Sequence, residues 1–249
     1  DNDGRRAKAA EDGVDIQDLT KAAWSGVDAL VLSPGIPHTH PAPHPVAALA
    51  RDAGVEIIGD IELLGREQQD AHFIGITGTN GKSTTTALIG HIFGLAGNPT
   101  QVGGNLGTPA LSLEALWAEG SYVLEMSSFQ LDLTRHMSFD IAVLLNIAPD
   151  HLDRHGDMAA YTAAKQKIFR SPRLKTAIVG IDGPDTLRIC NELRQREGLN
   201  VIPIATGRRL LDGVAANGGL LEDHGQAICD LEVARALTGR HNWQNAAAA

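Results

Sequence analysis

The residues best suited to chemistry form a glycine-rich stretch at positions 78–84, with the order Gly-Thr-Asn-Gly-Lys-Ser-Thr. A short apolar run precedes it and a run with helical apolar spacing follows, so the pattern predicts a strand, a tight turn and a helix. The glycines would turn several backbone N–H groups toward one point, and the helix would add the positive end of its dipole. Lys82 offers a mobile positive charge and Ser83 a hydroxyl for Mg²⁺. Together these features predict a binding site for a nucleoside triphosphate.

The loop departs in one respect from the common phosphate-loop pattern. The first glycine of that pattern would fall at position 76, which is isoleucine, so this loop is a shorter form that begins at Gly78. The alternative interpretation is a tight strand-to-helix turn with an incidental lysine. The apolar strand before the loop and the apolar helix after it favour nucleotide binding.

Further polar groups follow other predicted strands. Glu125 ends an apolar run, where a carboxylate beside the phosphate loop could bind Mg²⁺ directly or through water. A helix-capping or ion-paired glutamate is the alternative. After the next strand, four groups able to bind a metal or a polar substrate lie close together in the chain: Asn146, Asp150, His151 and Asp153. This density favours a site over a plain surface loop.

Two signals are weak when each is taken alone. Lys165 follows small residues in a helical stretch, and an isolated lysine on a helix is usually solvated. A glycine loop at 103–107 indicates a close approach of the backbone to a neighbour, and its Asn105 offers both a donor and an acceptor. Both gain weight only beside the other motifs.

A parallel sheet is needed to bring these residues together. From residue 71 on, predicted strands alternate with predicted helices, which indicates a mostly parallel sheet with helices on its faces. We expect strands at 73–77, 122–125, 141–146, 176–181 and 201–204, and helices at 82–95, 111–117, 158–169 and 184–196. Past residue 207, short runs separated by glycine turns predict a small β-meander. The last residues begin a helix without an end signal, which suggests that the domain is truncated there.

Residues 1–70 are expected to form an incomplete α/β unit. It would contain a short helix at 19–24, a buried strand at 27–32, a helix at 46–53, a strand at 55–58 and a helix with Asp60 as its N-cap. The loop at 33–37 follows a strand, at the edge where open parallel sheets bind ligands. Three histidines between 38 and 45 could suggest a metal site, but the prolines among them favour an extended, solvated loop.

The bulk composition excludes several classes of protein. With 43% hydrophobic and 20% charged residues the chain is typical of a soluble globular protein, and no apolar run approaches the roughly 20 residues of a membrane span. A net charge of −9, 4% aromatic residues and the lack of a basic block argue against nucleic-acid binding. Cys190 and Cys229 have neither disulfide nor metal spacing, so we expect small buried fillers and a reducing, cytoplasmic location.

Taken in order, six motifs resemble the Mur ligases, the ATP-dependent amino-acid-adding enzymes of peptidoglycan synthesis. These motifs lie at 78–84, 103–107, 125–131, 150–154, 163–165 and 241–245. Within that family, Ser-Pro-Gly-Ile-Pro at 33–37, Gly-Asp-Ile-Glu-Leu at 59–63 and Ser-Ser-Phe-Gln-Leu at 127–131 look like the members that add D-glutamate to UDP-N-acetylmuramoyl-L-alanine. The resemblance covers nearly the whole chain, apart from the meander at about 207–235.

The resemblance implies an α/β fold in several domains. Residues 1–70 would be the remainder of a Rossmann-like N-terminal domain that binds the UDP moiety. Residues 71–249 would be the central P-loop ATPase domain, with a mostly parallel sheet and the small β-meander, truncated at its C-terminal end. The third domain of the family, which helps to bind the incoming amino acid, would be absent, so we expect no ligation by this chain alone.

The resemblance also implies a reaction and a role for each matched residue. ATP would phosphorylate the substrate carboxylate, and the amine of D-glutamate would attack the resulting acyl phosphate. Residues implied in ATP binding are Gly78, Thr79, Asn80, Gly81, Lys82, Ser83, Thr84, Asn242 and Asn245. Residues implied in substrate binding are Ser33, Gly35, Asn105, Ser127, Gln130 and His151. Two Mg²⁺ ions would be held by Ser83, Glu125, His151 and Lys165, the lysine as a carbamate formed with CO₂. Lys82, His151 and Lys165 would be catalytic, in a monomer that inserts into no membrane.

Three rival interpretations remain open on the sequence. Another Mur ligase or a folylpolyglutamate synthetase would share the loop and the lysine, although the motifs at 33–37 and 127–131 argue against both. A kinase or plain P-loop ATPase would have no use for Lys165. A non-catalytic nucleotide-binding module is the third possibility.

Overall fold

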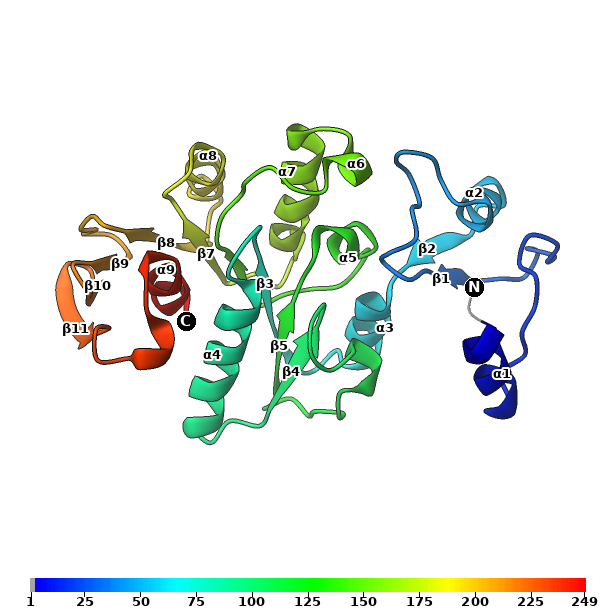
Figure 1. The fold of residues 1–249 in the computed structure, drawn as a ribbon, viewed down its shortest axis with the longest axis horizontal. Coiled ribbons are helices and arrows are strands. Elements are labelled where there is room, and N and C mark those ends of the chain that lie inside the picture. The colour runs from blue at the N-terminus through cyan, green and yellow to red at the C-terminus, as the bar shows by residue number, and fades with distance from the viewer. Residues whose placement is uncertain (1–2) are drawn as a thin grey trace.

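The computed structural model describes residues 3–249 and contains two sheets within that range. The larger sheet has nine strands in the order β11-β10-β9-β8-β7-β6-β3-β5-β4, and the smaller pairs β1 with β2 (Figure 1). The strands are β1 Ala29–Val31, β2 Glu56–Ile58, β3 His72–Thr77, β4 Thr100–Gly104, β5 Ser121–Glu125, β6 Ile141–Leu144, β7 Thr176–Gly180, β8 Asn200–Thr206, β9 Val214–Asn217, β10 Leu220–Asp223 and β11 Gln226–Asp230. The helices are α1 Asp3–Glu11, α2 Pro45–Asp52, α3 Asp60–Glu67, α4 Lys82–Leu95, α5 Ser128–Asp132, α6 Leu152–His155, α7 Met158–Gln166, α8 Pro184–Leu193 and α9 Arg240–Ala248.

The larger sheet is parallel from β4 to β9, as the alternation of strands and helices predicts. Strand β3 lies between β5 and β6, so the chain leaves β3 toward one edge of the sheet and later returns to its other side. This is the switch in strand order at which open α/β sheets bind ligands. The antiparallel hairpins β9-β10-β11 form the expected meander and extend the same sheet.

Helices cover both faces of this sheet and give it two hydrophobic cores. One core joins α4 and α9 to the strand residues Ile74, Ile76, Val123 and Val143. The opposite core is larger and packs α8 and the turn after α7 against Phe73, Tyr122 and their neighbours on the other side of the pleat. Alternate residues of β3 therefore face different layers, which explains why this strand is a continuous apolar run.

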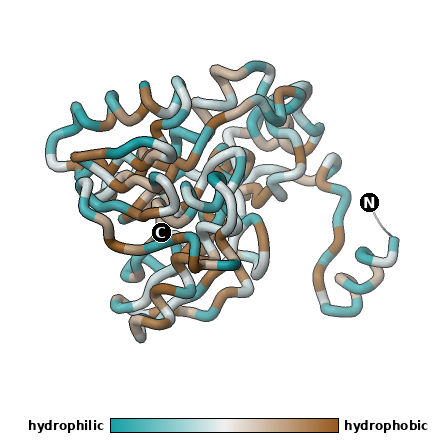
Figure 2. The backbone as a smooth tube through the Cα atoms, turned by 60° about the vertical axis from the view of Figure 1, so that its left-hand side comes forward, coloured by the Kyte–Doolittle hydropathy of each residue, from teal (hydrophilic) through white to brown (hydrophobic). Residues whose placement is uncertain are grey.

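The N-terminal unit, from α1 to α3, contains the smaller sheet. Its two-stranded sheet is covered by α2, while α1 has no buried residue and lies apart from the main body in both views (Figures 1 and 2). A cavity of about 1220 Å³ separates α1 from β1 and is lined by both.

Glu62 on α3 ties this unit to the large sheet. Its fully buried carboxylate accepts hydrogen bonds from the backbone N–H groups of Arg135, His136 and Met137 at 2.8–3.1 Å, and from the Arg66 side chain at 3.0 Å. Burial raises the pKa of Glu62, but these donors favour the charged form and hold the pKa below its ordinary value.

Two helices expected from the sequence do not form. Residues 19–24 make turns, because the Asp18 carboxylate accepts from the backbone and hydroxyl of Thr20 and so competes with a helical turn. In the stretch 111–117, the N–H groups of Glu114 and Leu116 bind side chains of Gln101, Gln68 and Tyr122 instead of carbonyls in the preceding turn. A short 3₁₀ turn, Ala110–Ser112, is all the helix found there.

Two smaller predictions are also corrected, and three short elements were not predicted. Asp60 is the first residue of α3 and makes no cap, because Gly59 takes the N-cap position. Cys190 is buried as expected, but Cys229 lies exposed on the edge strand β11. The sequence reading did not predict β4, α5 or α6, which are short and have little apolar periodicity. Over residues 3–249, no helix is both long enough and apolar enough to cross a membrane.

Candidate active site

The strand register brings the predicted site loops to one edge of the sheet. Gly104 on β4 and Ile76 on β3 both pair with Glu125 on β5, and Thr77 pairs with Leu144 on β6. The loops that follow these four strands therefore start at the same level. They carry Asn105, the phosphate loop, Ser127 and Asn146, respectively, so residues far apart in sequence share one carboxyl edge.

The phosphate loop is held in a conformation that glycine allows. Gly81 has φ +88° at the N-cap of α4, and a side chain there would collide with Asn245 on α9. Helix α4 begins directly after it, at Lys82, so the first N–H groups of α4 lack acceptors within the helix and open toward the loop. Such a helix start is an anion-binding arrangement.

Asn146 fixes the other half of the loop. Its carbonyl accepts from the N–H of Thr79 at 3.0 Å, and its side-chain oxygen accepts from the N–H of Asn80 at 2.9 Å. Its side-chain NH₂ donates to the Asn80 carbonyl and to the Gln244 side chain on α9. The resemblance implies that Thr79 and Asn80 bind ATP. In the structure, the backbone N–H groups of both residues donate hydrogen bonds to Asn146.

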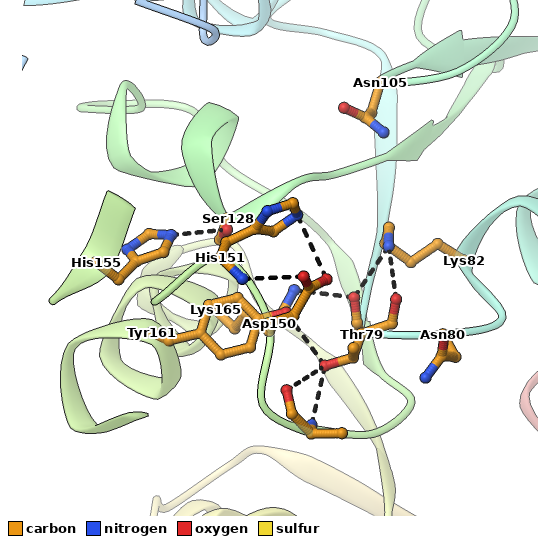
Figure 3. A network of polar contacts seen from close by, with 12 residues as sticks. Thr79, Asn80, Lys82, Asn105, Ser128, Asp150, His151, His155, Tyr161 and Lys165 are labelled. Carbon is orange, nitrogen blue, oxygen red and sulfur yellow. Dashed lines mark hydrogen bonds and ion pairs between the residues drawn. The ribbon is translucent and has the colours of Figure 1, made fainter. Parts of the chain in front are cut away.

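Two lysines converge on the same carbonyl. Lys82 Nζ donates to the carbonyls of Gly78 at 3.1 Å and Thr79 at 3.0 Å, and Lys165 Nζ donates to the Gly78 carbonyl at 2.9 Å (Figure 3). Lys165 is 2% exposed. Burial, and then the nearby charge of Lys82, lower the pKa of Lys165 to about 7, although Asp150 acts in the opposite direction. An amine that is partly neutral at physiological pH is a potential nucleophile.

Tyr161 connects this lysine to the phosphate loop, and the sequence reading gave it no role. Lys165 Nζ lies 4.7 Å from the centre of the Tyr161 ring, and the Tyr161 hydroxyl lies 3.1 Å from Thr79 Oγ1. Burial raises the pKa of Tyr161. Its position four residues before Lys165, one helical turn away, was the available signal.

Glu125 is buried at the end of β5 and has one side-chain partner among residues 3–249. Asn105 Nδ2 donates to Glu125 Oε1 at 2.8 Å, and the Asn105 backbone N–H donates to the Glu125 carbonyl at 2.9 Å. The glutamate caps no helix and pairs with no cation within the described part of the chain. Its second carboxylate oxygen is therefore available as a ligand for a cation.

His151 lies at the mouth of the site in an unusual backbone conformation. It has φ +51°, which is uncommon for a residue other than glycine and is often found at functional sites. Its Nε2 lies 3.4 Å from an Asp150 oxygen, and its ring centre lies 4.9 Å from that of Phe129. No group of three or more histidine, cysteine or acidic side chains in residues 3–249 is close enough to hold a metal ion without further ligands.

His155 is a second imidazole at the site, buried where His151 is exposed, and the sequence did not point to it. Its Nε2 lies 2.9 Å from Ser128 Oγ, its Nδ1 lies 3.8 Å from Asp132, and its ring stacks on Phe129 and packs against Tyr161. Burial lowers the pKa of His155, while Asp132 partly opposes the shift. This imidazole joins α5, α6 and α7 into one wall. A histidine four residues after another histidine was the only sequence signal.

Ser127 and Gln130, both expected to bind substrate, form the capping box of α5. Ser127 Oγ accepts from the Gln130 N–H at 3.2 Å, and Gln130 Oε1 accepts from the Ser127 N–H at 3.0 Å. Gln130 is 5% exposed. The structure thus gives Gln130 a structural role, whereas the half-buried Ser127 remains at the site edge.

The remaining predicted residues divide into near and distant groups. Asn245 lies against the phosphate loop, and its Nδ2 donates to Asn242 Oδ1 at 3.2 Å. Asn242 itself donates to the Thr238 carbonyl at the start of α9. Ser33 and Gly35 lie in the N-terminal unit, where Ser33 lines the cavity beside α1 and the Gly35 carbonyl accepts from Arg154.

The geometry can position and neutralise a polyphosphate beside a buried amine. Lys82 and Ser83 begin α4 directly after the loop, Glu125 can add one metal ligand, and Lys165 is buried against the Gly78 carbonyl of the loop. This arrangement suits phosphoryl transfer, in which charge stabilisation and alignment supply most of the catalysis.

Comparison with known sequences gives matches along nearly the whole chain. The chain is 52% identical over 98% of its length to UDP-N-acetylmuramoylalanine–D-glutamate ligase of Rhodospirillum rubrum, and 47% identical over 100% to the enzyme of that name from Phenylobacterium zucineum. These matches cover 53% and 55% of the two relatives, so the chain spans about half the length of the curated relatives it matches.

Solved structures share the fold at lower identity. The UDP-N-acetylmuramate:L-alanyl-γ-D-glutamyl-meso-diaminopimelate ligase of Neisseria meningitides matches with a TM-score of 0.62 and 19% identity, over 97% of this chain and 79% of that one. MurF ligase of Thermotoga maritima, solved with ADP, gives a TM-score of 0.56 and 16% identity, over 94% and 62%.

A family model also matches the part of the chain that carries the site. The model for the Mur ligase middle domain matches residues 76–249, from the end of β3 to the end of α9 and over more than half of the chain. The phosphate loop, Glu125, His151 and Lys165 all lie within that match. The chain therefore belongs to the Mur ligase family.

Proposed function

We propose that the full-length protein adds D-glutamate to UDP-N-acetylmuramoyl-L-alanine with ATP, as a step in peptidoglycan precursor synthesis in the cytoplasm. The observation that carries this proposal is the match of about half of all positions, along almost the entire chain, to relatives named for that reaction. The site geometry supports the chemistry, because a phosphate loop and a buried lysine meet at one sheet edge.

The proposed reaction activates a poor electrophile. The alanyl carboxylate attacks the γ-phosphorus of ATP, which forms an acyl phosphate and releases ADP. The amine of D-glutamate then attacks the acyl carbon, the C–O bond to phosphate breaks, and phosphate leaves as the amide forms. Lys82 and the first amides of α4 would hold the phosphates, with Gly78, Thr79 and Asn80 shaping the loop and Asn242 and Asn245 facing the adenine. Two anions must approach each other, so these donors neutralise charge at the point of attack.

The donor set fits Mg²⁺, which prefers few protein ligands together with phosphate oxygens and water. Ser83 and the unengaged oxygen of Glu125 would hold one ion, and His151 would contribute to a second. Bound Mg²⁺ would supply Lewis-acid neutralisation of the phosphate oxygens. That no three-residue metal cluster exists in residues 3–249 agrees with a metal that arrives with ATP.

Lys165 would act as a carbamate. Its neutral amine would add to CO₂ with loss of a proton, which turns a cation into an anion that can support a metal. The low pKa of Lys165, caused first by burial and then by Lys82, favours the neutral amine that this addition needs.

The substrate would lie between the two units. Residues 1–70 would bind the UDP moiety, with Ser33 and Gly35 near the diphosphate, and residues 71–249 would form the ATPase domain. Asn105, Ser127 and His151 would position the muramoyl-alanine end, and Gln130 would support Ser127 through the capping box. We propose that the protein acts as a monomer.

The test is an amino-acid panel on the full-length protein. We expect phosphate release from ATP only when UDP-N-acetylmuramoyl-L-alanine and D-glutamate are both present, measured by a coupled phosphate assay with product identification by mass spectrometry. Phosphate release with L-lysine or diaminopimelate and no response to D-glutamate would refute the proposed substrate. ATP hydrolysis independent of both substrates would indicate a plain ATPase.

A further inference from the structure

Arg154 on α6 joins the N-terminal unit to the central sheet. Its Nη1 donates to the Gly35 carbonyl at 2.9 Å, and its guanidinium carbon lies 4.5 Å from the centre of the Phe129 ring on α5. The guanidinium is thus held between the turn that follows β1 and the wall of the candidate active site. The ring of His40 also approaches Gly156, so the loop after β1 touches α6 at a second point.

The donors of Arg154 are poorly satisfied by the protein. Within residues 3–249, no carboxylate lies within 4.0 Å of its guanidinium, and its Nε is enclosed without a hydrogen-bond partner. Two other half-buried cations behave differently: Lys167 pairs with Asp132 at 2.7 Å, and Arg66 bonds two glutamates. An enclosed cationic donor without an acceptor is unfavourable unless a ligand supplies one.

Among the charged groups that act on the neighbouring His38, bases outnumber acids, in a protein of net charge −9. The charged groups that act most strongly on the neighbouring His38 are one acid, Asp132, and three bases, Lys167, Arg51 and Arg154. Asp132 is already paired with Lys167. The pKa values of His38 and His155 are lowered mainly by burial, so neither imidazole adds a fixed positive charge there near pH 7. Arg154 is therefore a fixed charge without an acidic partner in the described structure.

Arg154 contacts an edge of the small sheet of the kind at which α/β proteins bind ligands. Gly35 lies in the turn after β1, at the carboxyl end of a parallel pair, and the exposed Ser33 and Gly35 leave that turn open. A guanidinium presents several N–H donors in a rigid plane that matches phosphate oxygens, and stacking on an aromatic ring keeps that plane fixed. These features suit an anion with several oxygens that bridges the two units.

We propose that Arg154 binds the diphosphate of the UDP-linked substrate and thereby sets that substrate across the junction between the two units. This inference rests on the proposed function and adds to it a residue from the central unit. The Nε–H and the Nη groups would donate to phosphate oxygens, while Phe129 holds the plane of the guanidinium.

A structural clamp is the rival explanation, because Arg154 also holds the turn at Gly35. The two roles differ in which ligands they affect. A clamp would shape the turn for every ligand of the N-terminal unit, whereas a diphosphate contact matters only for ligands that carry phosphate. Uridine, UDP and UDP-N-acetylmuramoyl-L-alanine therefore separate the two explanations.

The experiment uses the full-length ligase with the variants Arg154→Gln and Arg154→Lys, and Arg188→Gln as the matched control. Arg188 lies exposed on α8 and is paired with Glu192. It contacts neither the junction between the two units nor the candidate active site. Binding of the three ligands is measured by calorimetry or by competition, together with the KM for ATP and the thermal midpoint. We expect R154Q to weaken UDP and the UDP-linked substrate roughly 10- to 100-fold, the range for a hydrogen bond to a charged group.

The same variant should leave uridine binding, the KM for ATP and the thermal midpoint close to those of the wild type. R154K keeps the charge but loses the planar fork, so we expect an intermediate loss of affinity for UDP and the UDP-linked substrate. If R154Q does not fold, the R154K result tests the proposal. The salt dependence of UDP binding should also become shallower in R154Q, since one ionic contact is gone.

Each other outcome has a distinct meaning. Equal binding of UDP by wild type and R154Q would overturn this inference and leave the proposed function intact. Equal weakening of uridine and UDP would identify a clamp and would also overturn it. A wild-type enzyme that binds no UDP-linked substrate, or does not ligate D-glutamate, would overturn the proposed function itself.

Discussion

At the scale of single residues, the candidate site depends on two lysines that share one carbonyl. Lys82 and Lys165 both donate to Gly78, and their proximity disfavours two positive charges. Because Lys165 is also 2% exposed, burial and the Lys82 charge together bring its pKa to about 7. A lysine in an unfolded chain has a pKa of about 10.4. The protonation of Lys165 therefore affects the stability of the fold as well as the chemistry of the site.

The first prediction concerns this linkage. Between about pH 7 and pH 10 the unfolded chain keeps a proton on Lys165 that the folded chain has released, so the free energy of unfolding rises with pH in this window. Lys165→Met removes the titration, and its stability should rise less over that range. Urea unfolding in CO₂-free buffer measures the difference, with Lys21→Met, 83% exposed, as control. Equal pH slopes in wild type and K165M would contradict the prediction.

The second prediction concerns the carbamate. With ¹³C-labelled bicarbonate near pH 8, the folded protein should show a carbamate carbonyl resonance that Lys165→Arg lacks. Lys167→Arg is the matched control, because Lys167 lies two residues away but its amine is paired with Asp132 at 2.7 Å. A signal that persists in K165R, or one that disappears in K167R, would place the modification elsewhere.

The sequence was sufficient to predict the residues that belong to local patterns. Lys82, Ser83 and Glu125 each occupy a place that strand, loop and helix spacing define, whereas the role of Lys165 was implied only by the resemblance to the Mur ligases. His155 has only its spacing from His151 as a local signal. The roles of His155 and Arg154 come from Phe129 and Gly35, which are distant in sequence. For the same reason the capping role of Gln130 could not be separated from substrate binding by spacing alone.

At the scale of elements, α3 is attached to the large sheet by one buried carboxylate. Glu62 accepts three backbone N–H groups from residues 135–137, and these donors hold its pKa below the ordinary value of 4.5 despite its burial. A lowered pKa means that the charged form stabilises the fold above about pH 4.5, and that this stability is lost as the pH falls through the folded-state pKa.

The third prediction follows from this attachment. Glu62→Gln puts an NH₂ group where backbone donors need an acceptor, so we expect a loss of roughly 2–4 kcal/mol at pH 7. The difference from wild type should begin to shrink as the pH falls below about 4.5, where Glu62 of the unfolded chain takes up a proton, and should go on shrinking until the folded protein is protonated there too. Glu67→Gln, exposed on the same helix, should cost little. A loss in E62Q that is the same at pH 4 and pH 7 would show that shape, not charge, holds α3.

The fourth prediction concerns the contact between the phosphate loop and α9. Asn146 binds the amide of Asn80 and the side chain of Gln244, so Asn146→Ala should loosen the loop from both. We expect ATP or ADP binding to weaken by roughly tenfold, in line with the loss of one or two hydrogen bonds. Calorimetry on residues 1–249 measures it, with Asn191→Ala on the exposed side of α8 as control. Unchanged affinity would show that the loop holds its conformation without Asn146.

Some elements could be predicted from periodicity and others could not. Helix α4 matches its predicted bounds, because its apolar spacing and glycine start agree. The expected helix at 111–117 fails because side chains outside the stretch, those of Gln68 and Tyr122, accept from the backbone N–H of Leu116. Strand β4 has glycines and polar residues and is formed by its pairing with β5. Tertiary contacts decide such segments.

At the scale of the whole molecule, the chain combines a large sheet and a small one that differ in packing. The large sheet has helices on both faces and two hydrophobic cores. The small sheet packs on α2, and a cavity of about 1220 Å³ lies between β1 and α1. A two-stranded sheet is marginally stable by itself.

The fifth prediction compares hydrogen exchange in the two sheets of residues 1–249. The amide of Leu32 bonds the Ile58 carbonyl at the end of the small sheet, whereas Val143 on β6 is fully buried between β3 and β7. Local opening needs less free energy where fewer apolar contacts are broken, so amides of β1 and β2 should exchange at least roughly tenfold faster than those of β3 and β6. Mass spectrometry with peptide resolution measures both sets at once. Equal protection would mean that Glu62 couples the sheets into one cooperative unit, and E62Q should then separate their exchange rates.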